Sequence, residues 1–87
     1  MMYTLEWSDR SRKDLKKLDT SLIRRITDKA ESIKSVPYHF LERYKDSDLW
    51  KLRVGDYRIF IEIDEKNKKL KVEHVENRKK AYKDKWV

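Results

Sequence analysis

Length and composition limit the chain to one small folded unit. Its 87 residues, 38% hydrophobic and 11% aromatic, suffice for one modest core but not for two domains. No cysteine is present, and Glu6, Asp9 and Arg10 interrupt any leading apolar run, so neither secretion nor a membrane span is predicted. We therefore expect a single domain over residues 1–87 that is soluble and cytoplasmic.

Positive charge is concentrated in the last quarter of the chain. The sequence has 23 Lys and Arg against 16 Asp and Glu, a net charge of +7. Residues 66–87 contain nine of the basic and three of the acidic residues, +6 in all, which leaves +1 before them. Such a segment attracts polyanions, so nucleic acid is the first partner to consider. A solvated lysine-rich surface is the alternative that charge alone leaves open.

The first two predicted elements are a strand and a short helix. Apolar and polar residues alternate over residues 3–7, as they do in a half-buried strand. Ser8 or Asp9 then caps a surface helix on which Leu15 and Leu18 lie one turn apart.

A longer helix follows, with Asp19 and Thr20 as its cap. We expect it to end near Ser35, because Pro37 disfavours helical geometry in the residue before it. Its apolar stripe consists of Leu22, Ile23, Ile26, Ala30 and Ile33.

After residue 48 the hydrophobic pattern changes to a period of two, which is typical of strands. Residues 38–48 show no period and are predicted to be a loop with room for one turn of helix. Residues 50–54 and 57–63 alternate as two strands, joined by a tight turn at Gly55 and Asp56. A second turn at residues 64–69 leads to a third strand, in which Leu70, Val72 and His74 alternate with Lys71, Glu73 and Val75.

These elements predict an α+β fold in the order β-α-α-β-β-β. Two N-terminal helices pack on a mostly antiparallel sheet, and a short helical tail follows. The sheet face away from the helices would carry Lys51, Arg53 and Arg58 around Phe60, with Glu62 as the only acid of those two strands. Like charges on neighbouring strands repel, so this clustering indicates a functional surface.

Two runs of residues resemble a known family. Residues 49–59 (LWKLRVGDYRI) are similar to the central hairpin of the RelE/ParE toxin superfamily. Residues 77–83 (NRKKAYK) resemble its C-terminal signature, in which an Arg, here Arg78, is followed four residues later by a Tyr, here Tyr82. The tail motif is closer to the RelE branch, and the order of elements agrees over essentially the whole chain.

The resemblance implies a toxin of a type II toxin–antitoxin system with a microbial ribonuclease-like fold. RelE-type members cut mRNA in the ribosomal A site without a metal or other cofactor, and they leave a 2′,3′-cyclic phosphate. An acidic, helical, RelB-like antitoxin holds them inactive. ParE members share the fold but inhibit DNA gyrase and lack much of the ribonuclease constellation.

Cleavage of RNA by its own 2′-hydroxyl needs a base, an acid and cations that hold the pentavalent phosphate. The parity of its strand predicts that His74 faces the core, and His39 falls in the irregular segment without a placed partner. Lys, Arg and Tyr must then carry the chemistry. Neighbouring cations disfavour a charged ammonium and favour a phenolate, so Lys51 beside Arg53, Arg58 and Arg78 is a coherent group.

The resemblance also implies roles for individual residues. Lys51 matches a lysine that stabilises charge or assists proton transfer, and Arg58 matches the arginine that holds the scissile phosphate. Arg78 would stabilise the transition state, and Tyr82 would act as a base or stack on a nucleobase. The residues expected to contact the RNA backbone are Arg53, Lys79, Lys80 and Lys83. Some RelE toxins carry a further lysine where this chain has Leu49.

Each assignment has a structural alternative. Lys51 and Arg53 would also suit a solvated strand face, and Arg58 would suit an ion pair with Glu62 or with an acid of the tail. Tyr82 would also suit docking of the tail onto the body. At the level of function, a ParE-like gyrase inhibitor and a weakened, RNA-binding toxin homologue remain as alternatives to the ribonuclease. The expected partners are an acidic antitoxin and the ribosome with its mRNA.

Overall fold

A computed structural model describes residues 2–78, which form five strands and three helices. In chain order these are β1 (Thr4–Trp7), α1 (Asp9–Lys16), α2 (Thr20–Ser32), α3 (Pro37–Phe40), β2 (Glu42–Arg43), β3 (Leu49–Val54), β4 (Tyr57–Asp64) and β5 (Lys69–Asn77). The predicted α+β fold is confirmed. None of the helices within these residues has the length and apolar character needed to cross a bilayer.

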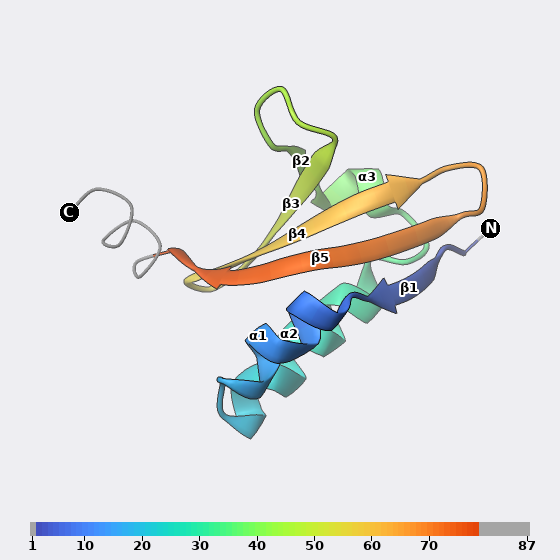
Figure 1. The fold of residues 1–87 in the computed structure, drawn as a ribbon. Coiled ribbons are helices and arrows are strands. Elements are labelled where there is room, and N and C mark those ends of the chain that lie inside the picture. The colour runs from blue at the N-terminus through green and yellow to red at the C-terminus, as the bar shows by residue number, and fades with distance from the viewer. Residues whose placement is uncertain (1, 79–87) are drawn as a thin grey trace.

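The strands form one sheet in the order β1-β5-β4-β3-β2. β1 is parallel to β5, and the other neighbours are antiparallel, so the chain's first strand lies at the edge beside its last. Figure 1 shows α1 and α2 together on one side of this sheet, with β1 beside β5. One face of the sheet is therefore covered by helices, and we call the other the open face.

Side-chain caps set the starts of both long helices. The Ser8 hydroxyl accepts the backbone N–H of Ser11 at 3.1 Å, and the Asp19 carboxylate accepts that of Leu22 at 2.9 Å. Each bond satisfies an N–H that would otherwise lack a partner in the first turn. α2 ends at Ser32, earlier than the predicted Ser35, and its capping residue Ile33 turns into the core.

The core lies between α2 and the inward positions of the three long strands. Its members are at most 8% exposed: Tyr3, Ile26, Ile33, Leu41, Leu52, Val54, Ile59, Ile61, Leu70, Val72 and Val75. Trp50 and Tyr57 pack against this core and are partly buried. Burial of each large aliphatic side chain contributes roughly 1.5–3 kcal/mol, which makes this layer the main source of stability.

The segment between α2 and β3 is more ordered than its sequence predicts. Pro37 occupies the first turn of α3, where its missing N–H is not needed. β2 follows and pairs with β3, placing Glu42 opposite Lys51 and Arg43 opposite Trp50. A strand of two residues has too few positions to show alternation, so pattern analysis did not detect it.

Strand β5 contains a bulge that changes its parity. Phe60 lies opposite His74, but the next residue, Ile61, lies opposite Val72, so Glu73 is an extra residue in β5. Before the bulge even-numbered residues face the core, and after it odd-numbered ones do. The prediction that His74 faces the core is therefore wrong, because the bulge turns it to the open face and buries Val75 instead.

The hairpin between β3 and β4 turns at Gly55 and Asp56, as predicted. Gly55 has φ +59°, a left-handed conformation that side chains disfavour, and a Cβ there would lie 3.2 Å from the Arg25 guanidinium. Glycine thus serves both the turn and the close approach of α2. This turn fixes the register that places Arg53 opposite Arg58.

A carboxylate joins three distant segments at the other end of the sheet. The Tyr3 hydroxyl donates to Glu65 at 2.8 Å, the Tyr38 hydroxyl donates to the same carboxylate, and Lys68 Nζ lies 2.7 Å from it. These partners, Lys68 first, lower the pKa of Glu65 to about 2. The bond to Glu65 also raises the pKa of Tyr38 to about 12. Glu65 therefore ties the turn between β4 and β5 to Tyr3 and to α3.

Replacing Glu65 with Gln is expected to lower the urea midpoint at pH 7. Because its folded pKa of about 2 lies below the ordinary 4.5, the stabilisation is complete above about pH 4.5 and is lost as the pH falls towards 2. The difference between the variant and the original protein should therefore shrink over that interval. Urea titrations followed by circular dichroism measure it, with Glu31→Gln as the control for an exposed charge on α2. A difference independent of pH would contradict the assignment.

Candidate nucleic-acid interface

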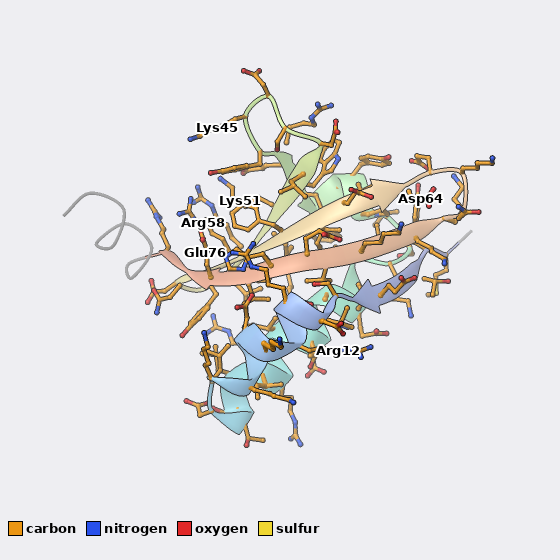
Figure 2. The ribbon with its side chains drawn as sticks, in the orientation of Figure 1. Arg12, Lys45, Lys51, Arg58, Asp64 and Glu76 are labelled. Carbon is orange, nitrogen blue, oxygen red and sulfur yellow. The ribbon has the colours of Figure 1, made fainter. Side chains whose placement is uncertain are left out.

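Three of the predicted cations lie on the open face of the β3–β4 hairpin. Lys51 lies opposite Phe60, and Arg53 lies opposite Arg58, on positions that alternate with the buried Leu52, Val54 and Ile59. Figure 2 shows Lys51 and Arg58 over the same half of the sheet, far from Asp64 at the other end of β4. The hairpin therefore brings these cations together as the sequence predicts.

Acids from the flanking strands accompany two of these cations. Lys51 Nζ lies 3.6 Å from Glu42 of β2, and Arg58 Nη2 lies 3.3 Å from Glu76 of β5. Each acid is the cross-strand neighbour of its partner on the adjacent strand. Glu62 is not the only acid that β3 and β4 place on this face, because β4 extends to Asp64, which has the same parity. The neighbouring strands contribute two more acids, Glu42 and Glu76.

Arg58 has more hydrogen-bond donors than its ion pair with Glu76 uses. Its side chain is 23% exposed, one of its nitrogens contacts Glu76, and its buried Nε has no hydrogen-bond partner within residues 2–78. The ion-pair alternative for Arg58 is thus present, with Glu76 of β5 as the partner in place of Glu62 or an acid of the tail. A guanidinium carries five N–H donors, so this pair leaves several for another anion.

The backbone of Arg78 reaches the same end of the sheet. Its N–H donates to the Asp56 carbonyl at 2.7 Å, which ties the residue after β5 to the hairpin turn. Arg78 itself is exposed. The other predicted tail residues, Tyr82, Lys79, Lys80 and Lys83, lie outside the described residues.

Beside the cations the open face has a cleft of about 410 Å³. Phe60 lies at its base, with the Tyr44 ring edge-on at 4.9 Å and the His74 ring nearly parallel at 6.0 Å. Leu49 also lines it, so the position where some relatives carry a lysine is here part of an apolar wall. The cleft thus combines aromatic surface with polar edges.

His74 is held between two carboxylates. Its Nδ1 lies 2.7 Å from Asp14 of α1, and its Nε2 lies 3.2 Å from Glu76. The same Asp14 oxygen accepts the backbone N–H of Val75 at 2.9 Å, so α1 occupies the edge of β5 beyond the end of β1. Both ring nitrogens can donate at once only when the imidazole is protonated. A chain of contacts therefore runs from Asp14 through His74 and Glu76 to Arg58.

His39 takes no part in this surface. It lies in α3, is exposed, and contacts the ring of Phe40 at 5.6 Å. Within residues 2–78 no group of three or more His, Cys, Asp or Glu side chains is arranged to hold a metal ion.

Four residues of this surface escaped sequence analysis: Glu42, Tyr44, Glu76 and Asp14. The first two lie in or after β2, which the sequence does not predict, and Glu76 lies just past Val75, the last residue in the alternation that predicts the third strand. Asp14 is separated from His74 by 60 residues, and nothing in the sequence pairs them. Its sequence position places Glu76 on the open face only when the bulge at Glu73 is known.

Comparison with known proteins identifies the family and the fold. Residues 5–82 match the family described as "ParE toxin of type II toxin-antitoxin system, parDE". No curated protein matches the chain.

Solved toxin structures share the fold. A chain of the RelBE2 toxin–antitoxin complex from Mycobacterium tuberculosis has a TM-score of 0.81 at 22% identity, covering 90% of this chain and 100% of that one. For the archaeal RelE–RelB complex from Pyrococcus horikoshii OT3 the TM-score is 0.72 at 27% identity, with 90% and 97% covered. For the chromosomal ParDE system from P. aeruginosa it is 0.74 at 11% identity, with 87% and 96% covered.

The fold is thus common to structures of both RelE and ParE systems. The family match spans β1 to the tail, including the hairpin and the Arg78 region. This chain is therefore a member of the ParE toxin family, a toxin of a type II toxin–antitoxin system within the RelE/ParE superfamily.

Proposed function

We propose that this toxin is an endoribonuclease of the RelE type that cuts mRNA in the A site of the ribosome. The observation that carries the proposal is the grouping of Lys51, Arg53 and Arg58 on one face of the hairpin, with the backbone of Arg78 tied to the turn beside them. A phosphate held there would meet cations from three separate positions along the chain. Such a group suits the negative charge that develops on a pentavalent phosphate.

The reaction would be an internal transesterification. The 2′-oxygen forms a bond to phosphorus, the bond from phosphorus to the 5′-oxygen breaks, and a 2′,3′-cyclic phosphate and a 5′-hydroxyl result. A base takes the proton of the 2′-hydroxyl, and an acid gives one to the leaving 5′-oxygen. Lys51 and Tyr82 are both candidates for the base, and no metal is needed in this scheme.

The acids beside Lys51 and Arg58 do not prevent phosphate binding. Glu42 has a side chain 67% exposed, and an ion pair at such a surface contributes only about 0–1 kcal/mol. Arg58 keeps donors beyond the one that contacts Glu76. A phosphate therefore competes with weak partners at Lys51 and can share Arg58 with Glu76.

A cognate antitoxin is the expected regulator. Structures that resemble this chain were solved as toxin–antitoxin complexes, including RelBE2 and RelE–RelB. A chain of net charge +7 with an exposed cationic face suits an acidic helical segment that becomes ordered on binding. Both partners would then act in the cytoplasm, where ribosomes are.

Inhibition of DNA gyrase is the second candidate, because the matched family is the ParE toxin family. Leu49 stands at the position of a lysine found in some RelE toxins, which also favours a binding role without chemistry. A gyrase inhibitor would use the same surface for contact with protein or DNA.

Ribosomes stalled on a defined message distinguish the two candidates. If the toxin is a ribonuclease, adding it should create a new 5′ end within the A-site codon, and message without ribosomes should remain intact. Primer extension maps these ends. An intact A-site codon with normal translation would exclude the ribosome-dependent activity.

A supercoiling assay tests the alternative. The ribonuclease proposal predicts unchanged gyrase activity over the concentrations at which messages are cut. Loss of supercoiling, or accumulation of cleaved DNA, would instead establish the gyrase candidate.

Arg58→Ala is expected to lower the rate of A-site cleavage by about 100-fold or more, the usual effect of removing one preorganised donor to a transition-state charge. Lys66→Ala is the matched control, since it removes an exposed cation from the β4–β5 turn at the opposite end of β4. Circular dichroism shows whether both variants are folded. Equal loss of activity in the two variants would mean that overall charge matters and the position of Arg58 does not.

A further inference from the structure

The cleft on the open face differs in charge from the cations beside it. Its lining includes Glu62, Glu73 and Glu76, against Arg10 and His74 as the basic residues. A phosphate would be repelled from these carboxylates. If Lys51 and Arg58 hold the phosphate of a ligand, the cleft would therefore hold another part of the same ligand.

Two carboxylates that line the cleft have no side-chain partner within the part of the chain that the structure describes. Among residues 2–78, neither the Glu62 side chain nor the Glu73 side chain makes a hydrogen bond or an ion pair; the Glu73 backbone carbonyl accepts from Ser8. Lys71 lies opposite Glu62 in the sheet, but its ammonium is 4.0 Å from Asp64 instead. Glu73 is half-buried at the bulge. Both are acceptors that a ligand with N–H groups would satisfy.

The walls of the cleft suit a flat ligand. Phe60, Tyr44 and His74 present aromatic surface, and Leu49 adds an apolar edge. Unpaired nucleobases are recognised in this way, by stacking on aromatic rings and by hydrogen bonds along their edges. A volume of about 410 Å³ lies within the range of small-ligand sites and exceeds the space that one base needs.

We propose that the cleft is a nucleobase subsite that prefers guanine. Guanine carries two adjacent donors, the ring N1–H and the 2-amino group, which can bind the two oxygens of one carboxylate. Adenine and cytosine each offer one amino group on that edge, and uracil offers one ring N–H between two carbonyls that carboxylates repel. The unpartnered Glu62 and Glu73 thus favour guanine most and uracil least.

Glu76 connects this subsite with the proposed phosphate site. One of its oxygens contacts Arg58 at 3.3 Å, and the other contacts His74 in the cleft at 3.2 Å. A base in the cleft and a phosphate on Arg58 would therefore be separated by about one side chain, the scale of a single nucleotide. The subsite rests on the proposed function, because it assumes that the phosphate on Arg58 belongs to RNA.

Binding of short RNAs tests the subsite without cleavage. Fluorescein-labelled uridine hexamers carry guanosine, inosine or uridine at one central position, with 2′-deoxy sugars at the centre to block attack. Fluorescence anisotropy at low salt should show about tenfold tighter binding of the guanine hexamer than of the uracil hexamer, the effect of one hydrogen bond to a charged group. The inosine hexamer, which lacks the 2-amino group, should fall between them.

Two substitutions locate the preference. Glu62→Gln and Glu73→Gln should each reduce the preference for guanine without weakening binding of the uracil hexamer, because each removes a negative charge. Glu31→Gln is the matched control, since Glu31 lies on α2 and pairs with Lys34. It should keep the full preference. Glu62 is exposed, so its variant retains the test if the half-buried Glu73 variant fails to fold.

Equal affinity for the guanine and uracil hexamers, or no binding of either, would overturn the subsite. So would a preference that survives in both glutamate variants. The proposed function fails in a different experiment. If the toxin does not cut in the A site, the preference for guanine in binding can still be observed. Conversely, cleavage without base preference would retain the proposed function and reject the subsite.

Discussion

The pairing of β5 with β4 determines what the open face of the sheet contains. On one side of the extra residue Glu73, Leu70 and Val72 enter the core, and on the other Val75 does. The bulge thereby turns His74 and Glu76 outward, beside Phe60 and Arg58. Without it, the strand's second half would present Val75 to solvent and bury an imidazole among aliphatic side chains. Burying Val75 in place of His74 is favourable, because an apolar side chain leaves water while His74 and Glu76 stay partly hydrated.

Contacts from α1 keep this arrangement in place. A bulge leaves backbone groups without their usual sheet partners, and here Ser8 donates to the Glu73 carbonyl at 3.0 Å while Asp14 accepts the Val75 N–H. Ser8 also caps α1, so one side chain serves the start of a helix and the edge of a strand. The short helix is therefore more than a link to α2, because it takes the place along β5 that β1 leaves open.

Sequence patterns predicted those parts of the molecule that depend on local chemistry. Caps at Ser8 and Asp19, the turn at Gly55 and the alternation in β3 and β4 each need only neighbouring residues, and each was found. Patterns failed where distant residues decide the outcome. The bulge at Glu73 depends on packing against α1, and β2 exists only because β3 supplies its hydrogen bonds. The grouping of Lys51, Arg53 and Arg58 followed from hairpin parity, whereas the acids facing them came from strands whose register is not local.

If the open face binds RNA as proposed, its acids also explain how one surface would hold both ends of a nucleotide. A uniformly basic face would bind phosphates anywhere and would not fix the position of a base. Here the cations lie along β3 and the start of β4, while unpartnered carboxylates and aromatic rings lie over the middle of β4 and β5. Glu76 stands at the boundary, because it contacts Arg58 on one side and His74 on the other. Repulsion from the carboxylates would direct a phosphate towards Arg58, and the N–H groups of a base would then face the Glu62 and Glu73 side chains, which have no partner among residues 2–78. A protein that used this surface merely to attract polyanions would have no use for acids at that boundary, so their placement favours recognition of one nucleotide in a fixed orientation.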